Sequence, residues 1–118
     1  MSDPRCLIVD PDRQSAETLA GIMGRHGFST HVIAQAFDAL RHLRKNRYDL
    51  ILFDLSTPGG DGAFVLEQVK REMPDVTEYT IIVTNNALAA SDVTGGIAII
   101  GKSDLKPMLQ YLIPEKTR

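Results

Sequence analysis

Short apolar runs alternate with helix-like segments through this sequence, and this alternation constrains the fold more than any other feature. The runs contain few polar residues and cover residues 5–10, 28–34, 48–54, 79–84 and 96–101. Strands of this kind are covered on both faces, as in a parallel sheet. The segments between them place apolar residues three and four positions apart, which is typical of amphipathic helices. The chain therefore predicts an α/β fold in which helices cover both faces of a five-stranded parallel sheet.

Residues with strong conformational preferences mark where the helices end. The expected helices cover approximately residues 11–26, 36–47, 64–73 and 103–113. Gly27 is placed to stop the first helix, and Pro74 ends the third. Ser103 is suited to cap the last helix.

Length, charge and composition are those of a soluble globular protein. The 118 residues fit a single domain over residues 1–118. The 13 basic and 15 acidic residues leave a net charge of −2, which indicates neither a direct nucleic-acid partner nor a membrane partner. No apolar run approaches the roughly 20 residues that span a bilayer, and no secretory signal is visible, so we expect a cytoplasmic location. Cys6 is expected to be a buried small hydrophobe, and His26, His31 and His42 are expected on the surface.

Polar side chains stand where the expected strands end. Asp10 follows the first run, Asp54 follows the third and is succeeded by Ser56, Thr84 ends the fourth, and Lys102 follows the fifth. Parallel α/β sheets bind ligands at the carboxyl ends of their strands. We therefore expect these side chains to lie at one edge of the sheet.

This set of residues is suited to phosphoryl chemistry. Neighbouring carboxylates repel each other, and Mg²⁺ relieves the repulsion by binding one or two of them together with water and phosphate oxygens. An aspartate can itself be the nucleophile and form an aspartyl phosphate. Lys102 would supply a positive point charge and Thr84 a hydroxyl group to the same phosphoryl group. The residues therefore indicate that Asp54 accepts a phosphoryl group.

The aspartates at the strand ends could instead have purely structural roles. Asp54 could form an Asx-turn ahead of the Pro-Gly loop. Asp10 could cap the following helix, with Pro11 in its first turn. Asp12 is better explained as an acid of the first helical turn than as a metal ligand.

Four motifs resemble, in order and spacing, those of the receiver domain of bacterial two-component response regulators. They are "CLIVDPD", "LILFDLSTPGGDG", "IIVTN" and "IIGKS". The resemblance implies a doubly wound, flavodoxin-like sheet with strand order 2-1-3-4-5. It also implies that Asp54 is the phosphoacceptor and that Mg²⁺ is bound by Asp10, Asp54 and the backbone carbonyl of Ser56. Thr84 would be the switch hydroxyl and Lys102 the lysine that senses the phosphoryl group.

The same resemblance implies a signalling function. A histidine kinase or a phosphotransfer protein would supply the phosphoryl group, and an unidentified downstream protein would receive the signal. The chain would not be an enzyme beyond self-phosphorylation and self-dephosphorylation at Asp54. The sequence leaves open whether it acts alone or as a homodimer.

Several positions depart from the pattern of this family. Pro11 stands where a second acid is usual, which should weaken Mg²⁺ binding. Ser103 replaces a proline, so the bond after Lys102 should be trans, and Ile99 replaces the switch aromatic. The short interval between Thr84 and Lys102 predicts a shortened fourth helix region.

Two alternative functions follow from these observations. The departures are compatible with a phosphorylation-independent pseudo-receiver that acts as a protein-interaction module. The stretch "LIVDPDRQ" also resembles the first motif of haloacid-dehalogenase-like phosphohydrolases, in which Asp10 would be the nucleophile.

Overall fold

The structure, a computed structural model, describes residues 3–55, 61–84 and 97–107. Eight strands and helices occur in these ranges: β1 (Arg5–Val9), α1 (Arg13–Arg25), β2 (Ser29–Ile33), α2 (Ala36–Lys45), β3 (Leu50–Phe53), α3 (Asp61–Glu72), β4 (Thr80–Thr84) and β5 (Ala98–Gly101). Two 3₁₀ turns, η2 (Pro74–Tyr79) and η3 (Lys102–Asp104), precede β4 and follow β5. All paired strands are parallel, in the order β2-β1-β3-β4-β5, so the predicted fold is confirmed.

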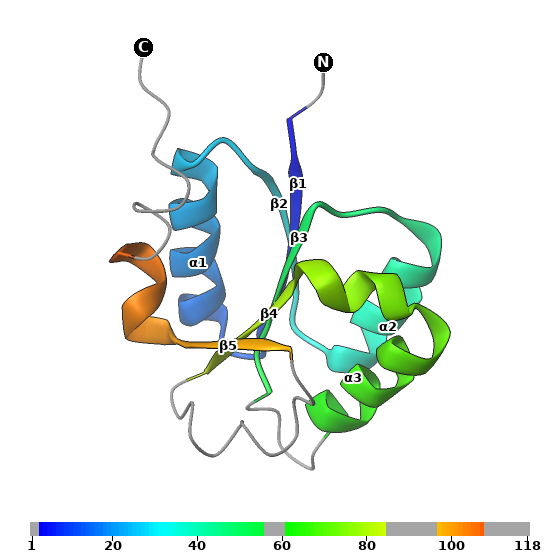
Figure 1. Ribbon diagram of the computed structural model, residues 1–118. Helices are drawn as coiled ribbons and strands as arrows, with labels where there is room; N and C mark the ends of the chain where they lie inside the picture. Colours follow the sequence, from blue (N-terminus) through cyan, green and yellow to red (C-terminus); the bar gives the residue numbers. More distant parts are fainter. Residues whose placement is uncertain (1–2, 56–60, 85–96, 108–118) are drawn as a thin grey trace.

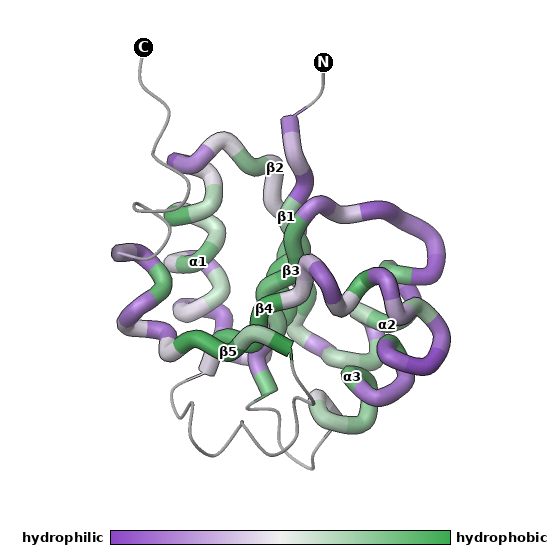
Figure 2. The backbone as a smooth tube through the Cα atoms, in the orientation of Figure 1, coloured by the Kyte–Doolittle hydropathy of each residue, from purple (hydrophilic) through white to green (hydrophobic). Residues whose placement is uncertain are grey.

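The sheet separates two hydrophobic cores. Helix α1 covers one face, and α2 and α3 cover the other (Figure 1). In the inner strand β1, Leu7 and Val9 pack toward α2 and α3, whereas Cys6 and Ile8 pack toward α1. Successive side chains of a strand point to opposite faces, so both faces of β1 must be apolar. Figure 2 shows the result, with hydrophobic strands in the centre and more hydrophilic helix exteriors.

Helix α1 ends in a Schellman motif at the predicted glycine. Gly27 has a φ of 91°, a left-handed conformation that suits glycine. The Phe28 N–H donates to the Met23 carbonyl at 3.1 Å, and the Gly27 N–H donates to the Gly24 carbonyl at 3.0 Å. These two bonds satisfy carbonyl groups that the helix end would otherwise leave without donors.

The last expected helix begins differently from the prediction. Ser103 lies inside the turn η3 and has no capping position, because the chain first forms a 3₁₀ turn and becomes α-helical from Leu105. No peptide bond in the described ranges is cis, as predicted for the bond that follows Lys102. The shortened fourth helix region and residues 108–113 of the last helix fall outside the described residues.

Two predictions about single side chains have opposite outcomes. Cys6 is fully buried, as predicted, and burial raises the pKa of its thiol to about 12. The expectation that His26 lies on the surface is wrong, because its side chain is 4% exposed. It follows the last turn of α1, where its Nδ1 lies 2.9 Å from the Ile22 carbonyl oxygen and so donates to it.

The described helices include none with the length and apolar character that crossing a bilayer requires.

Candidate functional site

Two buried aspartates lie at the carboxyl edge of the sheet, one after β1 and one after β3. Asp10 is 1% exposed and Asp54 is 2% exposed. The Asp10 N–H donates to the Ile33 carbonyl at 3.0 Å, and the Asp54 N–H donates to the Val9 carbonyl at 2.8 Å. Both backbones thus continue the hydrogen bonding of the sheet by one residue. Since β1 and β3 are neighbours, this continuation places the two carboxylates near each other.

Lys102, which follows the edge strand β5, bridges these two carboxylates at the same carboxyl edge of the sheet. Its Nζ lies 2.7 Å from Asp54 Oδ2 and 3.1 Å from Asp10 Oδ2. Its side chain is 16% exposed, so the ion pairs are largely shielded from water. The lysine follows β5 directly, and the pairing of Gly101 with Thr84 in β4 sets its position. The structure therefore brings together Asp10, Asp54 and Lys102, as the strand-end pattern predicted.

The pKa of Lys102 reflects competition between burial and its ion pairs. Burial is the largest single influence and lowers the pKa of the ammonium group. The hydrogen bonds and charges of Asp54 and Asp10 act in the opposite direction, and together they raise the pKa above its ordinary value of 10.5. Lys102 is therefore held in its charged form between the two acids.

Ser15 belongs to the same cluster, although the sequence analysis did not identify it. Its Oγ accepts a hydrogen bond of 2.8 Å from Lys102 Nζ. Ser15 lies in the first turn of α1, which begins three residues after Asp10. A polar residue in the first turn after a strand-end acid was the available signal. The hydroxyl gives the ammonium a third partner in addition to the two carboxylates.

Thr84 is buried at the end of β4, with 5% exposure, on the same edge of the sheet. Asp12 is the N-cap of α1, and its Oδ1 accepts a hydrogen bond of 3.1 Å from the Gln14 N–H. Its own N–H donates to Asp10 Oδ1 at 2.9 Å. Asp12 thus has a structural role, but as the N-cap of α1 rather than as the expected acid of its first turn, and Asp10 is not the cap of this helix. Ser56 lies outside the described residues.

The chemistry of these donors fits a hard divalent cation. Mg²⁺ binds oxygen ligands and commonly takes one or two carboxylates, with waters in the remaining positions. Asp10 and Asp54 present two such carboxylates at a single point, where Lys102 already supplies positive charge. The described residues contain no group of three or more His, Cys, Asp or Glu side chains arranged around one metal position. With two carboxylates as ligands, the site fits an ion that keeps several of its waters.

Comparison with known proteins identifies the family that the sequence motifs resemble. The family model of the response regulator receiver domain matches residues 6–100. A response regulator receiver protein from Anaeromyxobacter sp. (strain Fw109-5) is 32% identical over 107 residues, which are 89% of this chain and 45% of that protein. The DNA-binding response regulator MtrA of Mycobacterium tuberculosis is 38% identical over 68 residues, 58% of this chain and 30% of MtrA. The chain thus spans less than half the length of these curated relatives.

Solved structures of response regulator proteins share the fold of this chain. The response regulator protein TrrA from Thermotoga maritima, in complex with Mg²⁺-BeF, superimposes with a TM-score of 0.78 at 23% identity. That match covers 92% of this chain and 98% of TrrA. A CheY-like receiver domain protein from Methanospirillum hungatei gives a TM-score of 0.75 at 26% identity, with coverage of 95% and 94%.

Proposed function

Since this chain belongs to the response regulator receiver domains, we propose that it is a phosphoacceptor signalling module of a two-component system and that Asp54 is the acceptor. The observation that carries the proposal is the convergence of Asp54, Asp10 and Lys102 at one edge of the sheet. A histidine kinase or a phosphotransfer protein supplies the phosphoryl group. Similarity to regulators of bacteria supports a bacterial, cytoplasmic setting for this exchange.

In the transfer step, a carboxylate oxygen of Asp54 attacks the phosphorus atom of the donor. A new P–O bond forms as the P–N bond to the donor histidine breaks, and the electron pair of that bond remains on the imidazole. Bound Mg²⁺, held by Asp10 and Asp54, would neutralise the negative charge of the phosphoryl oxygens. The structurally similar protein TrrA was crystallised with Mg²⁺-BeF, which supports the proposal that this chain also binds Mg²⁺.

Phosphorylation of Asp54 would change the charge close to Lys102 and Thr84. The new group adds roughly −1.5 to −2 charges. Lys102 is already 2.7 Å from Asp54 Oδ2, so its ammonium needs little movement to contact the phosphoryl oxygens. Thr84 lies buried on the neighbouring strand and offers a hydroxyl donor from the same edge. Closure of these two residues on the phosphoryl group would transmit its presence to β4 and β5.

The first prediction is that the chain accepts one phosphoryl group from a small-molecule phosphodonor in the presence of Mg²⁺. Intact mass spectrometry should show this gain in the wild type and no gain in Asp54→Asn. Asp12→Asn is the matched control, because asparagine caps a helix as well as aspartate does. It should be phosphorylated like the wild type. An equal mass gain in Asp54→Asn would place the acceptor elsewhere.

A phosphorylation-independent interaction module is the second candidate. It is favoured by Pro11, which stands where the family usually has a second acid, and by the ion pairs that Lys102 already makes with both acids. Such a module would show no mass gain at saturating phosphodonor and Mg²⁺ while its circular dichroism spectrum remained that of a folded protein. The downstream partner in either case is proposed to be another protein or domain, since relatives such as MtrA are much longer than this chain.

A further inference from the structure

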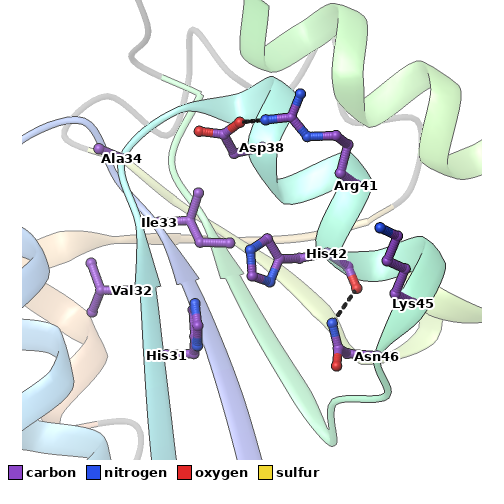
Figure 3. Close-up of a pocket in the computed structure, with 9 residues that line it drawn as sticks. All are labelled: His31, Val32, Ile33, Ala34, Asp38, Arg41, His42, Lys45 and Asn46. Atoms are coloured by element: carbon purple, nitrogen blue, oxygen red, sulfur yellow. Dashed lines mark hydrogen bonds and ion pairs between the residues drawn. The ribbon is translucent and has the colours of Figure 1, made fainter.

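A cavity of about 650 Å³ lies on the side of the molecule formed by β2 and α2. Strand β2 is the edge of the sheet, so its outer side faces this cavity rather than another strand. Two of the three histidines of the chain, His31 from β2 and His42 from α2, line the cavity. Figure 3 shows their rings side by side between the strand and the helix.

The separation of the two rings matches a pair of imidazoles that share one metal ion. Their centroids are 4.8 Å apart, and the planes are inclined by 48°. Metal–nitrogen bonds of roughly 2.0–2.1 Å, at angles between square-planar and tetrahedral, place the centroids of two ligating rings about 4.5–5.2 Å apart. The observed distance lies in this range.

The ring nitrogens are available for a ligand. Within the described part of the chain, neither imidazole makes a hydrogen bond through its ring, and the contact of His42 with Asn46 is through its backbone carbonyl. Neutral imidazole nitrogens are common ligands of borderline transition metals such as Cu²⁺ and Zn²⁺. The pair therefore has the donor chemistry of a metal site.

The nearby cations do not converge on the rings. The Arg41 guanidinium is ion-paired with Asp38 and is directed toward that carboxylate (Figure 3). An anion site would require these positive groups to point to a common position, whereas a metal site requires neutral nitrogens that do so. The geometry thus favours a cation ligand over an anion.

We propose that His31 and His42 form a two-histidine site for a divalent transition-metal ion, such as Cu²⁺ or Zn²⁺, with water in the remaining coordination positions. The backbone holds both ligands in place, because Ile33, two residues after His31 in β2, and Leu43, next to His42 in α2, are buried in the same core. A bound ion would link the edge strand β2 to helix α2. This site is separate from Asp10 and Asp54 and does not depend on phosphorylation.

The test is a titration of the purified, untagged chain with CuCl₂ or ZnCl₂ by isothermal calorimetry. In excess MgCl₂, which fills the Asp10–Asp54 site, the wild type should bind one Cu²⁺ or Zn²⁺ ion per chain, and electron paramagnetic resonance of the Cu²⁺ form should show coupling to two imidazole nitrogens. His31→Ala and His42→Ala should each weaken binding by about tenfold or more, which equals ~1.4 kcal/mol. Zn²⁺ should raise the melting temperature of the wild type but not of His42→Ala, since the ion binds the folded site.

Two variants separate this site from other sources of binding. Lys45→Ala removes a cation from the cavity lining and should leave metal affinity unchanged or higher. Asp54→Asn should also leave it unchanged, because Asp54 belongs to the other site. The proposal is wrong if both histidine variants bind the metal like the wild type, or if Asp54→Asn abolishes binding. It is also wrong if inorganic phosphate binds in a manner that requires Lys45 while neither metal binds.

Discussion

Lys102 is the residue on which the electrostatics of the candidate site depend. It is the shared partner of two aspartates whose side chains are almost fully buried. Removing one member of a buried ion pair leaves an uncompensated charge in a poorly solvated place. Ser15 adds a hydrogen bond to the same ammonium but carries no charge. Lys102 should therefore contribute to stability mainly through charge, and Ser15 mainly through positioning.

We predict that the free energy of unfolding of the wild type exceeds that of Lys102→Met by an amount that decreases as the pH rises through the alkaline range. The folded state raises the pKa of Lys102 above 10.5, so the ammonium is favoured by folding. Its stabilising contribution is fully present below pH 10.5 and is lost as the pH rises above that value toward the pKa in the folded state. Urea unfolding of both proteins across the alkaline range measures this difference.

Ser15→Ala is the control for this experiment. It keeps both ion pairs, so its stability should follow the same alkaline dependence as that of the wild type. A difference between the wild type and Lys102→Met that stays constant across the alkaline range would contradict the assigned role of the ammonium.

Helix α1 shows how local sequence signals set the bounds of an element. Asp12 caps its beginning, and Gly27 follows its end in a left-handed conformation. Both signals act through backbone groups within a few residues and require no tertiary contact. The bounds of this helix therefore determine where Ser15 stands relative to Asp10 and Lys102.

We predict that Gly27→Ala destabilises the protein by about 1–2 kcal/mol, because an alanine Cβ is disfavoured in the left-handed region. Gly24→Ala is the matched control inside the same helix. A Cβ at Gly24 would meet no atom within 4 Å, and alanine is the better helix former, so this change should be neutral or stabilising by up to ~1 kcal/mol. Thermal unfolding of the two variants checks the contrast. Equal destabilisation by both would show that the φ of Gly27 is not the cause.

At the scale of the whole molecule, β1 lies between β2 and β3 and has a core on each face. Cys6, the one cysteine of the chain, is in this strand and is fully buried. Its thiol, with a pKa raised to about 12 by burial, is also far from forming the reactive thiolate. Because Cys6 packs toward α1, exposure of this thiol should require that α1 separates from the sheet.

We predict that an aromatic disulfide reagent modifies Cys6 at a rate set by the opening of the protein. Reaction in native buffer should be slow, should accelerate in parallel with unfolding in urea, and should reach one equivalent in the denatured chain. Absorbance of the released thiolate measures the rate. Rapid modification without denaturant would mean that α1 separates locally from β1, in conflict with the packing of these two elements in one core.

The order of strands and helices, the Gly27 helix stop and the strand-end acids could be predicted from the sequence, because each depends on backbone periodicity or on a few neighbouring residues. The Lys102 bridge was predicted only as a meeting of strand ends, since its contacts span 92 and 48 positions and require the strand order. Ser15, buried His26 and the His31–His42 pair became visible only in the tertiary structure. The contacts of Ser15 with Lys102 and of His31 with His42 are set by how helices pack on the sheet. His26 bonds to Ile22 within its own helix, and only its burial depends on that packing.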